Sequence, residues 1–471
     1  MLTPDSAALQ SAANQGMREN MPGPGRISGL FKAAGAGGVA AKLRSRRMPW
    51  SQCGINRCWR HGKQGDAMRH IGMGTIVRGK TGQAIQEAVD RTAARGGGIV
   101  FLPAGTYHLD AGLKMKSNIM LQGEGRATLL KRSPLAETPL AENAAPGAAH
   151  VVVKNAGAFR AGVEVVIREV NPNGPIRDMT RVKKVRGNKV WLEKPLLCKY
   201  AVSRKAMLFN AFPVILGREV ENVIVQHLAV DGARPENESP SAGECEGIQF
   251  TDCSGCKVLD CIAFNCGGFG ISCSGGENIT FRGCESSGNV WHGFHVGLGK
   301  PTGSTRCAIE NCYAHHNDWI GIYICWNVTE SVFLGNHLSD NKLHGLLIGP
   351  FDNRNLIANN VISNNGDSGI MVARRAHPCQ SNTFVNNILC DNGKPGVTPA
   401  VKIESPKEGR YEHFLFARNM IIETRKVKGP GAAAFFIDEQ TDHIMLADNY
   451  LQGAWRSLAD SRSKGRNNSI K

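Results

Sequence analysis

The segment WHGFHV, residues 291–296, places two histidines and a tryptophan around one glycine. Imidazole is the side chain best suited to accept a proton near neutral pH. Later segments of the same pattern supply the phenol of Tyr323 and the guanidinium of Arg374. Elimination at a uronate sugar needs a base for the C5 proton, a donor for the leaving oxygen and a cation for the enolate-like intermediate. His295, Tyr323 and Arg374 are the candidate catalytic residues for these three roles, in that order.

Aromatic and charged residues near the same segments are candidates for substrate binding. Aromatic rings stack on sugar faces, and cations pair with the carboxylates of an acidic sugar. The same residue types are also ordinary on the surface of a repeat protein, and the sequence leaves that alternative open. The candidate substrate-binding residues are His292, Trp326, Asp352, Arg375, Lys402 and Glu404.

The elements that position these residues belong to an internal repeat that begins near residue 219. Seven segments share a template in which an apolar pair precedes a histidine, cysteine or asparagine, and two fainter copies follow. Such a column, stacked about 4.8 Å apart, forms an amide ladder at an inward corner. Cysteine is small and tolerates burial, so the thiols stack in the same column, although adjacent coils also permit disulfides. The shared position is occupied by His227, Cys261, Cys284, Cys312, Asn336, Asn360, Asn387, Asn419 and Asn449.

A second template, GIQF, GISC, GFHV, GIYI, GLLI and GIMV, recurs in phase with the first. Two motifs in phase, with strands and no helices between them, predict a parallel β-helix. The residue after each glycine points inward and the next points outward. The histidines of WHGFHV are therefore expected at partly exposed positions of one coil. The predicted outward column reads Gln249, Ser272, His295, Tyr323, Leu347, Met371 and Lys402.

Other parts of the chain complete the predicted organisation. Residues 1–75 are rich in Gly, Pro, Ser and Arg and are expected to be a disordered basic arm. Residues 76–132 combine an amphipathic helix with strand and turn segments, which is how a solenoid caps its open end. Residues 133–210 alternate in polarity and predict a small antiparallel β insertion, followed by coils over 211–455 and a basic tail over 456–471.

The net charge of +16 is concentrated at the ends of the chain. Residues 1–80 carry thirteen Lys/Arg against three Asp/Glu, and residues 456–471 carry five against one, which leaves about +2 for the body. Solvated termini explain this better than a nucleic-acid partner, which we do not predict. No window reaches the roughly 18 apolar residues of a membrane span.

The segment QAIQEAVDRTAARGGGIVFLPAGTYHLDAGLKMKSNIMLQGEG, residues 83–125, resembles the N-terminal cap and first coils of the pectate-lyase superfamily. NVISNNGDSGI and its sister segments resemble bacterial right-handed parallel β-helix repeat proteins. The resemblance covers about residues 80–450 and implies an all-β, right-handed parallel β-helix. It also implies an extracellular or periplasmic location, although MLTPDSAALQ does not read as a secretory signal.

A closer resemblance is to a largely uncharacterised bacterial group with segments such as GHGLHPGSGS, FCW and GISIGHRDTDN. The corresponding segments here are WHGFHVGLGK, ICWNV and GLLIGPFDNRN. Pro350 and Phe351 replace the His and Arg of that group, and Arg354 replaces an Asp. The chain therefore departs from the group at positions near its candidate site.

We predict a protein that binds an anionic uronate polysaccharide and cleaves it by β-elimination. No cofactor is predicted, and the sequence leaves a requirement for calcium open. No metal ligands are predicted, because the coils are poor in the Asp and Glu with which pectate lyases hold calcium. A glycoside hydrolase of the same fold is one alternative, and it needs two carboxylates about 5–10 Å apart. A non-catalytic glycan-binding or scaffold protein is another. The acidic cluster open to a hydrolase comprises Asp231, Glu244, Glu246 and Asp252.

Overall fold

The computed structural model describes residues 74–134, 136–169, 176–234, 245–297, 303–373, 377–428, 431–465 and 467–470. The predicted arm over 1–75 lies almost wholly outside these ranges, as do Glu244, Arg374 and Arg375. No helix within the described ranges is long and apolar enough to cross a membrane.

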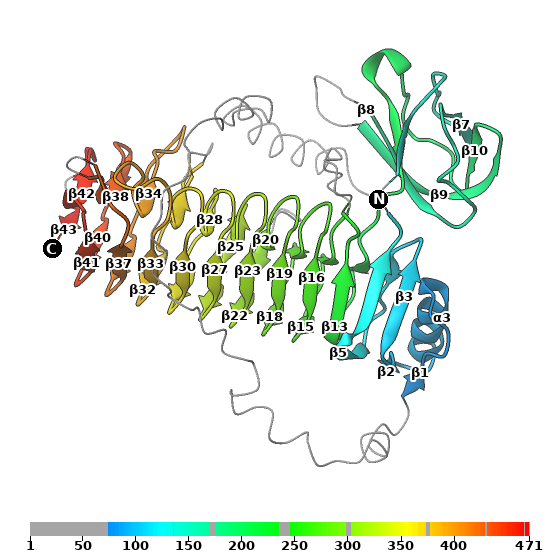
Figure 1. Ribbon diagram of the computed structural model, residues 1–471, viewed down its shortest axis with the longest axis horizontal. Helices are drawn as coiled ribbons and strands as arrows, with labels where there is room; N and C mark the ends of the chain where they lie inside the picture. The colour runs from blue at the N-terminus through cyan, green and yellow to red at the C-terminus, as the bar shows by residue number, and fades with distance from the viewer. Residues whose placement is uncertain are drawn as a thin grey trace, which may run out of the picture.

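Short strands wind into an elongated solenoid that runs the length of Figure 1. Two long parallel sheets form its walls, which confirms the predicted parallel β-helix. The 11-stranded sheet comprises β4 (Leu113–Lys114), β12 (Ile215–Arg218), β14 (Ile248–Thr251), β17 (Ile271–Ser274), β20 (Phe294–Gly297), β24 (Ile322–Cys325), β28 (Leu346–Ile348), β31 (Ile370–Val372), β34 (Val401–Ile403), β38 (Ala433–Ile437) and β42 (Ser457–Ser461).

The other wall is a 22-stranded sheet to which most coils contribute two strands. Its strands are β1 (Thr75–Ile76), β2 (Gly98–Phe101), β3 (Gly105–Leu109), β5 (Ile119–Arg132), β13 (Ile224–Asp231), β15 (Lys257–Leu259), β16 (Ile262–Phe264), β18 (Thr280–Arg282), β19 (Glu285–Ser287), β22 (Ala308–Glu310), β23 (Tyr313–His315), β26 (Val332–Leu334), β27 (His337–Ser339), β29 (Leu356–Ala358), β30 (Val361–Ser363), β32 (Thr383–Val385), β33 (Ile388–Cys390), β36 (Leu415–Ala417), β37 (Met420–Glu423), β40 (Met445–Ala447), β41 (Tyr450–Gly453) and β43 (Ser469–Ile470).

The helix α3 (Gly82–Ala93) closes the N-terminal end of the solenoid, as predicted. It begins at Thr81, whose hydroxyl accepts a hydrogen bond from the backbone N–H of Ala84 at 3.2 Å. Its buried face consists of Ile85, Ala88, Val89 and Thr92. Because this face covers the first coil, the core does not end at an open, apolar edge.

The asparagine column is buried and fully bonded. The Oδ1 atom of Asn360 accepts hydrogen bonds from the backbone N–H of Asn336 at 2.8 Å and from its Nδ2 at 3.0 Å. The Nδ2 of Asn360 donates to the Phe333 carbonyl and to Oδ1 of Asn387, both at 2.9 Å. The same arrangement repeats along the predicted ladder, which runs through Asn336, Asn360, Asn387, Asn419 and Asn449.

Two further polar columns at other corners were not predicted. One links Asn289, Asn317, Asn341, Asn365 and Asn392. The other links Ser331, Asn355 and Asn382. The later coils therefore turn their corners mainly with side-chain amides that satisfy backbone groups of the neighbouring coil.

The prediction that His227 belongs to the first column is wrong by one residue. Leu228 is aligned with Cys261, because Ala229 pairs with Ile262 in the parallel register. His227 has a φ of 51°, like Asp260 at the same turn of the next coil, and its side chain is about half exposed. The residue before the column thus takes a left-handed conformation and points away from the core.

The stacked cysteines are free thiols, as expected. Each of the thirteen cysteines in the described ranges is unbridged, and eleven of them are buried. Cys261 donates to the carbonyls of Val225 and Leu259 at 3.5 and 3.3 Å. Burial raises the pKa of the Cys261 thiol well above its usual value, so it stays protonated.

The insertion is a separate antiparallel sheet with its own core, and Figure 1 shows it set off from the N-terminal end of the solenoid. Antiparallel pairings confirm the predicted β insertion, while the exact domain boundaries stay a prediction. Its strands are β6 (Glu137–Pro139), β7 (His150–Val152), β8 (Glu164–Glu169), β9 (Ile176–Arg186), β10 (Lys189–Leu192) and β11 (Met207–Phe209).

Candidate functional site

The outer face of the 11-stranded sheet carries the predicted column in the predicted register. His295 on β20 pairs with Ser272 on β17 and with Tyr323 on β24. The ring centroids of His295 and Tyr323 are 5.5 Å apart. Leu347 and Met371 continue the column on β28 and β31. Stacking of successive coils is sufficient to bring the two candidate catalytic side chains side by side.

The expectation that these positions are partly exposed is wrong. His295 is 4% exposed and Tyr323 is 2% exposed, although both side chains lie outside the solenoid core. Burial lowers the pKa of His295 to about 3, so the imidazole is neutral near neutral pH. Its Nδ1 has no hydrogen-bond partner. Aromatic neighbours, and not water, surround this histidine.

Those neighbours form a group of six rings that we call the aromatic cluster. His295 stacks on Phe269 at 4.5 Å, and His292 meets Tyr323 edge-on at 4.9 Å. The cluster spans three successive coils and combines aromatic residues one or two positions before the in-phase glycines with the outward residues of the following strands. Its members are Phe269, Trp291, His292, His295, Trp319 and Tyr323.

Two indoles form the partly exposed edge of the aromatic cluster. Trp291 and Trp319 stack with centroids 5.7 Å apart and planes inclined by 11°. Their backbones are also bonded, because Trp319 N–H donates to the Trp291 carbonyl at 3.1 Å. Both rings adjoin His292, at 6.3 and 5.8 Å respectively. A stacked pair of this kind offers a flat apolar surface of the sort that ligand sites use.

Two cations adjoin this edge. Asp318, directly before Trp319, accepts from Arg234 at 2.6 Å and from Lys342 at 2.8 Å. The side chains of Arg234 and Lys342 therefore converge on the carboxylate that precedes Trp319. Cations favour an anionic ligand over a neutral one.

The remaining predicted binding residues are spread over later coils. Lys402 follows Met371 in the column and forms an ion pair with Glu404 at 2.6 Å. Trp326 meets Phe351 edge-on at 5.9 Å. Arg374 and Arg375 lie outside the described residues.

Asp352, predicted as a substrate-binding residue, is fully buried at a corner of the solenoid. Its Oδ1 accepts from the Val328 N–H at 2.8 Å, and its Oδ2 accepts from the Gly349 N–H at 2.9 Å. Both carboxylate oxygens therefore satisfy backbone groups at this corner, and its role in substrate binding stays a prediction.

The acidic residues open to a glycoside hydrolase come from both sheets of the solenoid, and both Asp231 and Glu246 act electrostatically on Cys266. Asp231 ends β13 of the 22-stranded sheet, where its Oδ1 accepts from the Ala233 N–H at 2.9 Å. Glu246 and Asp252 instead flank β14 of the 11-stranded sheet, and Glu246 is buried. Glu244 lies outside the described residues. Within those residues, no three His, Cys, Asp or Glu side chains converge as metal ligands.

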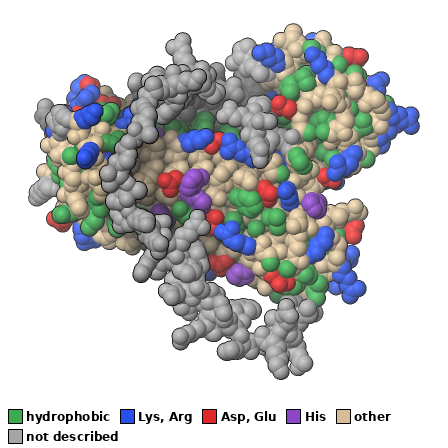
Figure 2. All heavy atoms as spheres, in the orientation of Figure 1, with side chains coloured by type: hydrophobic (Ala, Val, Ile, Leu, Met, Phe, Trp, Pro, Cys, Tyr) green, Lys and Arg blue, Asp and Glu red, His purple; other side chains and the backbone are tan. Residues whose placement is uncertain are grey.

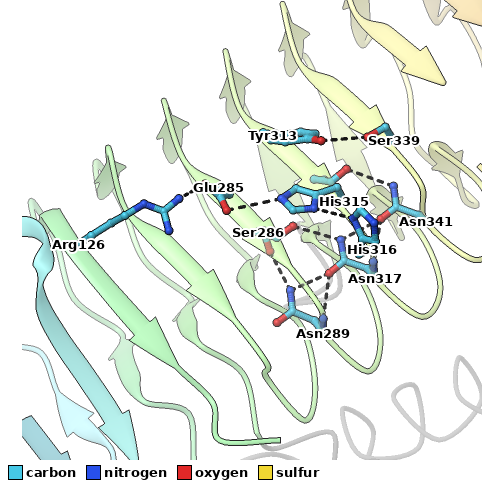
Figure 3. Close-up of polar contacts among 11 residues, drawn as sticks. Arg126, Glu285, Ser286, Asn289, Tyr313, His315, His316, Asn317, Ser339 and Asn341 are labelled. Atoms are coloured by element: carbon cyan, nitrogen blue, oxygen red, sulfur yellow. Dashed lines mark hydrogen bonds and ion pairs between the residues drawn. The ribbon is translucent and has the colours of Figure 1, made fainter. Parts of the chain in front are cut away.

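Sequence reasoning missed a second group, on the outer face of the 22-stranded sheet (Figure 3). Glu285 on β19 contacts Arg126 at 2.5 Å and His315 Nε2 at 3.5 Å. The Nδ1 atoms of His315 and His316 are 2.8 Å apart. The contact with His315 is the main cause of a Glu285 pKa below its usual value, and Arg126 adds to it. This carboxylate is therefore ionised at neutral pH.

Tyr313 lies between two imidazoles in the same group. Its ring stacks on His315 at 4.1 Å and on His337 of the next coil at 4.8 Å. Its hydroxyl is 3.2 Å from the Ser339 hydroxyl. The sequence signal for this group was the pair of outward residues Tyr313 and His315 in CYAHH, followed by His337 at the matching position one coil later.

Comparison with known proteins supports the architecture. The family described as right handed beta helix region matches residues 218–305 and 301–400. The family described as rhamnogalacturonase A/epimerase, pectate lyase-like, matches residues 78–167. No curated protein matches this sequence.

Solved structures of low sequence identity have the same fold. The A-module of the mannuronan C-5 epimerase AlgE6 of Azotobacter vinelandii is 18% identical, with a TM-score of 0.56 over 83% of this chain and 93% of that module. PfbA, a surface adhesin of Streptococcus pneumoniae, is 12% identical, with a TM-score of 0.51 over 82% of this chain and 92% of the adhesin chain. At these identities the similarity shows the fold and not the activity. The chain therefore has a right-handed parallel β-helix fold, and it is similar to the two matched families over the ranges given.

Proposed function

We propose that this protein binds an anionic polysaccharide on the outer face of the 11-stranded sheet and cleaves it by β-elimination. The observation that carries the proposal is the stacked, partly exposed pair Trp291 and Trp319, which adjoins the buried imidazole of His292. Indole faces bury the apolar side of a sugar ring, and the cations beside Asp318 favour carboxylates.

The fold is compatible with this ligand class. Among its structural neighbours, AlgE6 is a mannuronan C-5 epimerase, so a β-helix of this type can act on a uronate polymer. The adhesin PfbA has the same fold and a name that states a surface role. The choice between reaction and binding therefore rests on residues of this chain.

Elimination assigns a role to each catalytic candidate. His295 removes the C5 proton, the electrons form the C4–C5 double bond, and the bond from C4 to the glycosidic oxygen breaks. Tyr323 donates its proton to that oxygen. The neutral state of His295 is the state that accepts a proton, and a nearby substrate carboxylate raises its pKa. Arg374 is proposed to stabilise the negative charge of the intermediate.

Burial favours binding without catalysis as a second candidate function. His295 and Tyr323 expose almost none of their surface, whereas a base must reach the proton that it removes. A glycan held only by the indole pair would use the same face without chemistry.

Turnover on defined polymers separates these functions. The protein is incubated with polygalacturonate, alginate and a neutral polymer such as dextran, and both ultraviolet absorbance and reducing ends are followed. Elimination yields both signals on an acidic polymer, hydrolysis yields reducing ends alone, and a binding protein yields neither. We expect both signals on at least one acidic polymer and none on dextran.

Variants then assign the chemistry. His295→Ala and Tyr323→Phe should each lower turnover by about a hundredfold or more, the usual size of an acid/base contribution. His344→Ala is the control, since His344 lies in the column before the glycine and has no assigned role. Equal losses in the three variants, with thermal unfolding unchanged, would contradict the assignment of His295 and Tyr323.

A further inference from the structure

The antiparallel insertion carries much of the positive charge of the body. Residues 133–210 contain thirteen Lys/Arg and six Asp/Glu, a net charge of +7. The body as a whole carries only about +2, so the coils are net acidic. Figure 2 shows the blue Lys and Arg side chains spread over the insertion, at the upper right of that view. The charge therefore belongs to one module and is not a general property of the solenoid.

Strand alternation places several of these cations on one face of the β9–β10 hairpin. Val190 and Leu192 are buried and Val185 packs against the same core, so their neighbours in sequence point to the other side. Trp191 pairs with Lys184 across the hairpin and with His150 on β7. Two further cations follow, because Lys189 pairs with Arg186 next to the turn. We call the face formed by His150, Lys184, Arg186, Lys189 and Trp191 the cationic face.

Trp191 lies at the centre of this face. The Nζ atoms of Lys184 and Lys189 lie 4.8 and 5.7 Å from its ring centroid, and the His150 ring lies 5.6 Å away. These are cation–π distances, which hold the ammonium groups above an apolar ring.

The cations of this face are not neutralised by the protein. No described carboxylate forms an ion pair with Lys184, Arg186 or Lys189, whereas Arg160 and Arg204 of the same insertion pair with Asp110 and Glu169. The closest acidic residue along β10 is Glu193, two positions after Trp191. Unpaired like charges on one small face repel one another, and an anionic ligand removes that cost.

We propose that the cationic face is a second binding site for acidic polysaccharide, separate from the aromatic cluster. The chemistry of the face selects a flexible polyanion, because its cations spread over a flat hairpin with one aromatic ring among them. Single-stranded nucleic acid is recognised instead by successive stacking rings along a groove. The choice of polysaccharide rests on the proposed function, and the site itself rests on the charge and geometry of the hairpin.

Retention of the full-length protein in gels containing polygalacturonate tests this site. The double variant Lys184→Ala/Lys189→Ala should lose about tenfold in affinity, with a weaker dependence on salt, because it removes two cations from the contact. Trp191→Ala should also weaken retention. Lys194→Ala/Lys199→Ala is the matched control, since it removes the same charge from the same module. The backbone of Lys194 bonds to Thr180, four residues along β9 from Lys184.

Each outcome decides between the claims. Equal losses of affinity in the two double variants would show that only the total charge of the module matters, which would overturn the site. Unchanged retention of the Lys184→Ala/Lys189→Ala variant would also overturn it. Tighter binding of a single-stranded oligonucleotide than of polygalacturonate would overturn the ligand class. Loss of retention in a protein with no turnover on any polymer would support this site while contradicting the proposed elimination. Thermal unfolding confirms that each variant is folded.

Discussion

On the 11-stranded sheet, His295 lies against Phe269 and Tyr323 without a charged partner, and burial alone lowers its pKa to about 3. On the 22-stranded sheet, His315 lies in a partly exposed group and faces the carboxylate of Glu285. Both histidines point outward from similar strands in neighbouring coils. The difference shows that the solenoid repeat determines the column of a residue, while the residues beside that column determine its exposure and charge.

The largest expected effect of this difference is on stability. His295→Glu places a carboxylate among aromatic rings, whereas His337→Glu places one at an exposed position of the other face. We expect the first to lower the free energy of unfolding by about 3–5 kcal/mol and the second by about 0.5 kcal/mol or less. Denaturant unfolding measures both. Similar values for the two variants would contradict the contrast between the faces.

The ladder at the corner between the two strands that a coil contributes to the 22-stranded sheet provides a buried group whose bonds are all made. Asn360→Leu removes the bonds that Asn360 makes with the backbone N–H of Asn336 and with the carbonyl of Phe333, so it should destabilise by about 1–3 kcal/mol. Asn359→Gly is the control, because Asn359 is exposed and has a φ of 55° that glycine adopts freely. An unchanged melting temperature for Asn360→Leu would show that the ladder contributes no stability.

Lowering the pH should reduce the stability of the protein through the buried His295 of the 11-stranded sheet. The pKa of His295 is depressed in the folded state, so the stability that it contributes is present above its unfolded pKa near 6.5 and is lost as the pH falls towards 3. Lowering the pH from 7 to 5.5 should cost about 1 kcal/mol through this residue. His295→Phe should remove that part of the pH dependence. A pH profile unchanged by the substitution would indicate a solvated imidazole.

The smallest effect is expected for the ion pairs of the exposed group. Glu285→Gln removes the contacts with Arg126 and His315, yet Arg126 is largely exposed and water screens its charge. We expect a loss of about 0.2–1 kcal/mol that disappears in high salt. A loss of stability as large as that of His295→Glu would show that the outer face of the 22-stranded sheet excludes water as fully as the aromatic cluster does.

Much of the fold was predictable, because two motifs recurring in phase specify a parallel β-helix and an interior column of amides. The register of His295 with Tyr323 followed from that period. The burial of His295 and Tyr323 could not be predicted in the same way. It depends on the rings of Phe269 and the two tryptophans, which lie in the turn before each strand and pack beside the column. His227 was misplaced because Leu228 and His227 fit the template equally well, and only the backbone conformation distinguishes them.

The group around Tyr313, on the 22-stranded sheet, shows the same limit of prediction from a repeat pattern. A sequence template marks Tyr313 and His315 as outward residues of one strand. Arg126, which pairs with Glu285 in the same group, is more than 150 residues from Glu285 in sequence, so this ion pair cannot be inferred from the local pattern. Contacts across distant coils require the register of the whole solenoid.

Binding of short oligogalacturonates tests most directly whether glycan is held by the aromatic face. The measurement is made by calorimetry in the Lys184→Ala/Lys189→Ala background, so that the cationic face contributes little. We predict that Trp291→Ala and Trp319→Ala each lower the affinity about tenfold or more, while Tyr313→Ala on the opposite sheet leaves it unchanged. Undiminished binding in both tryptophan variants, or a loss confined to Tyr313→Ala, would contradict the account.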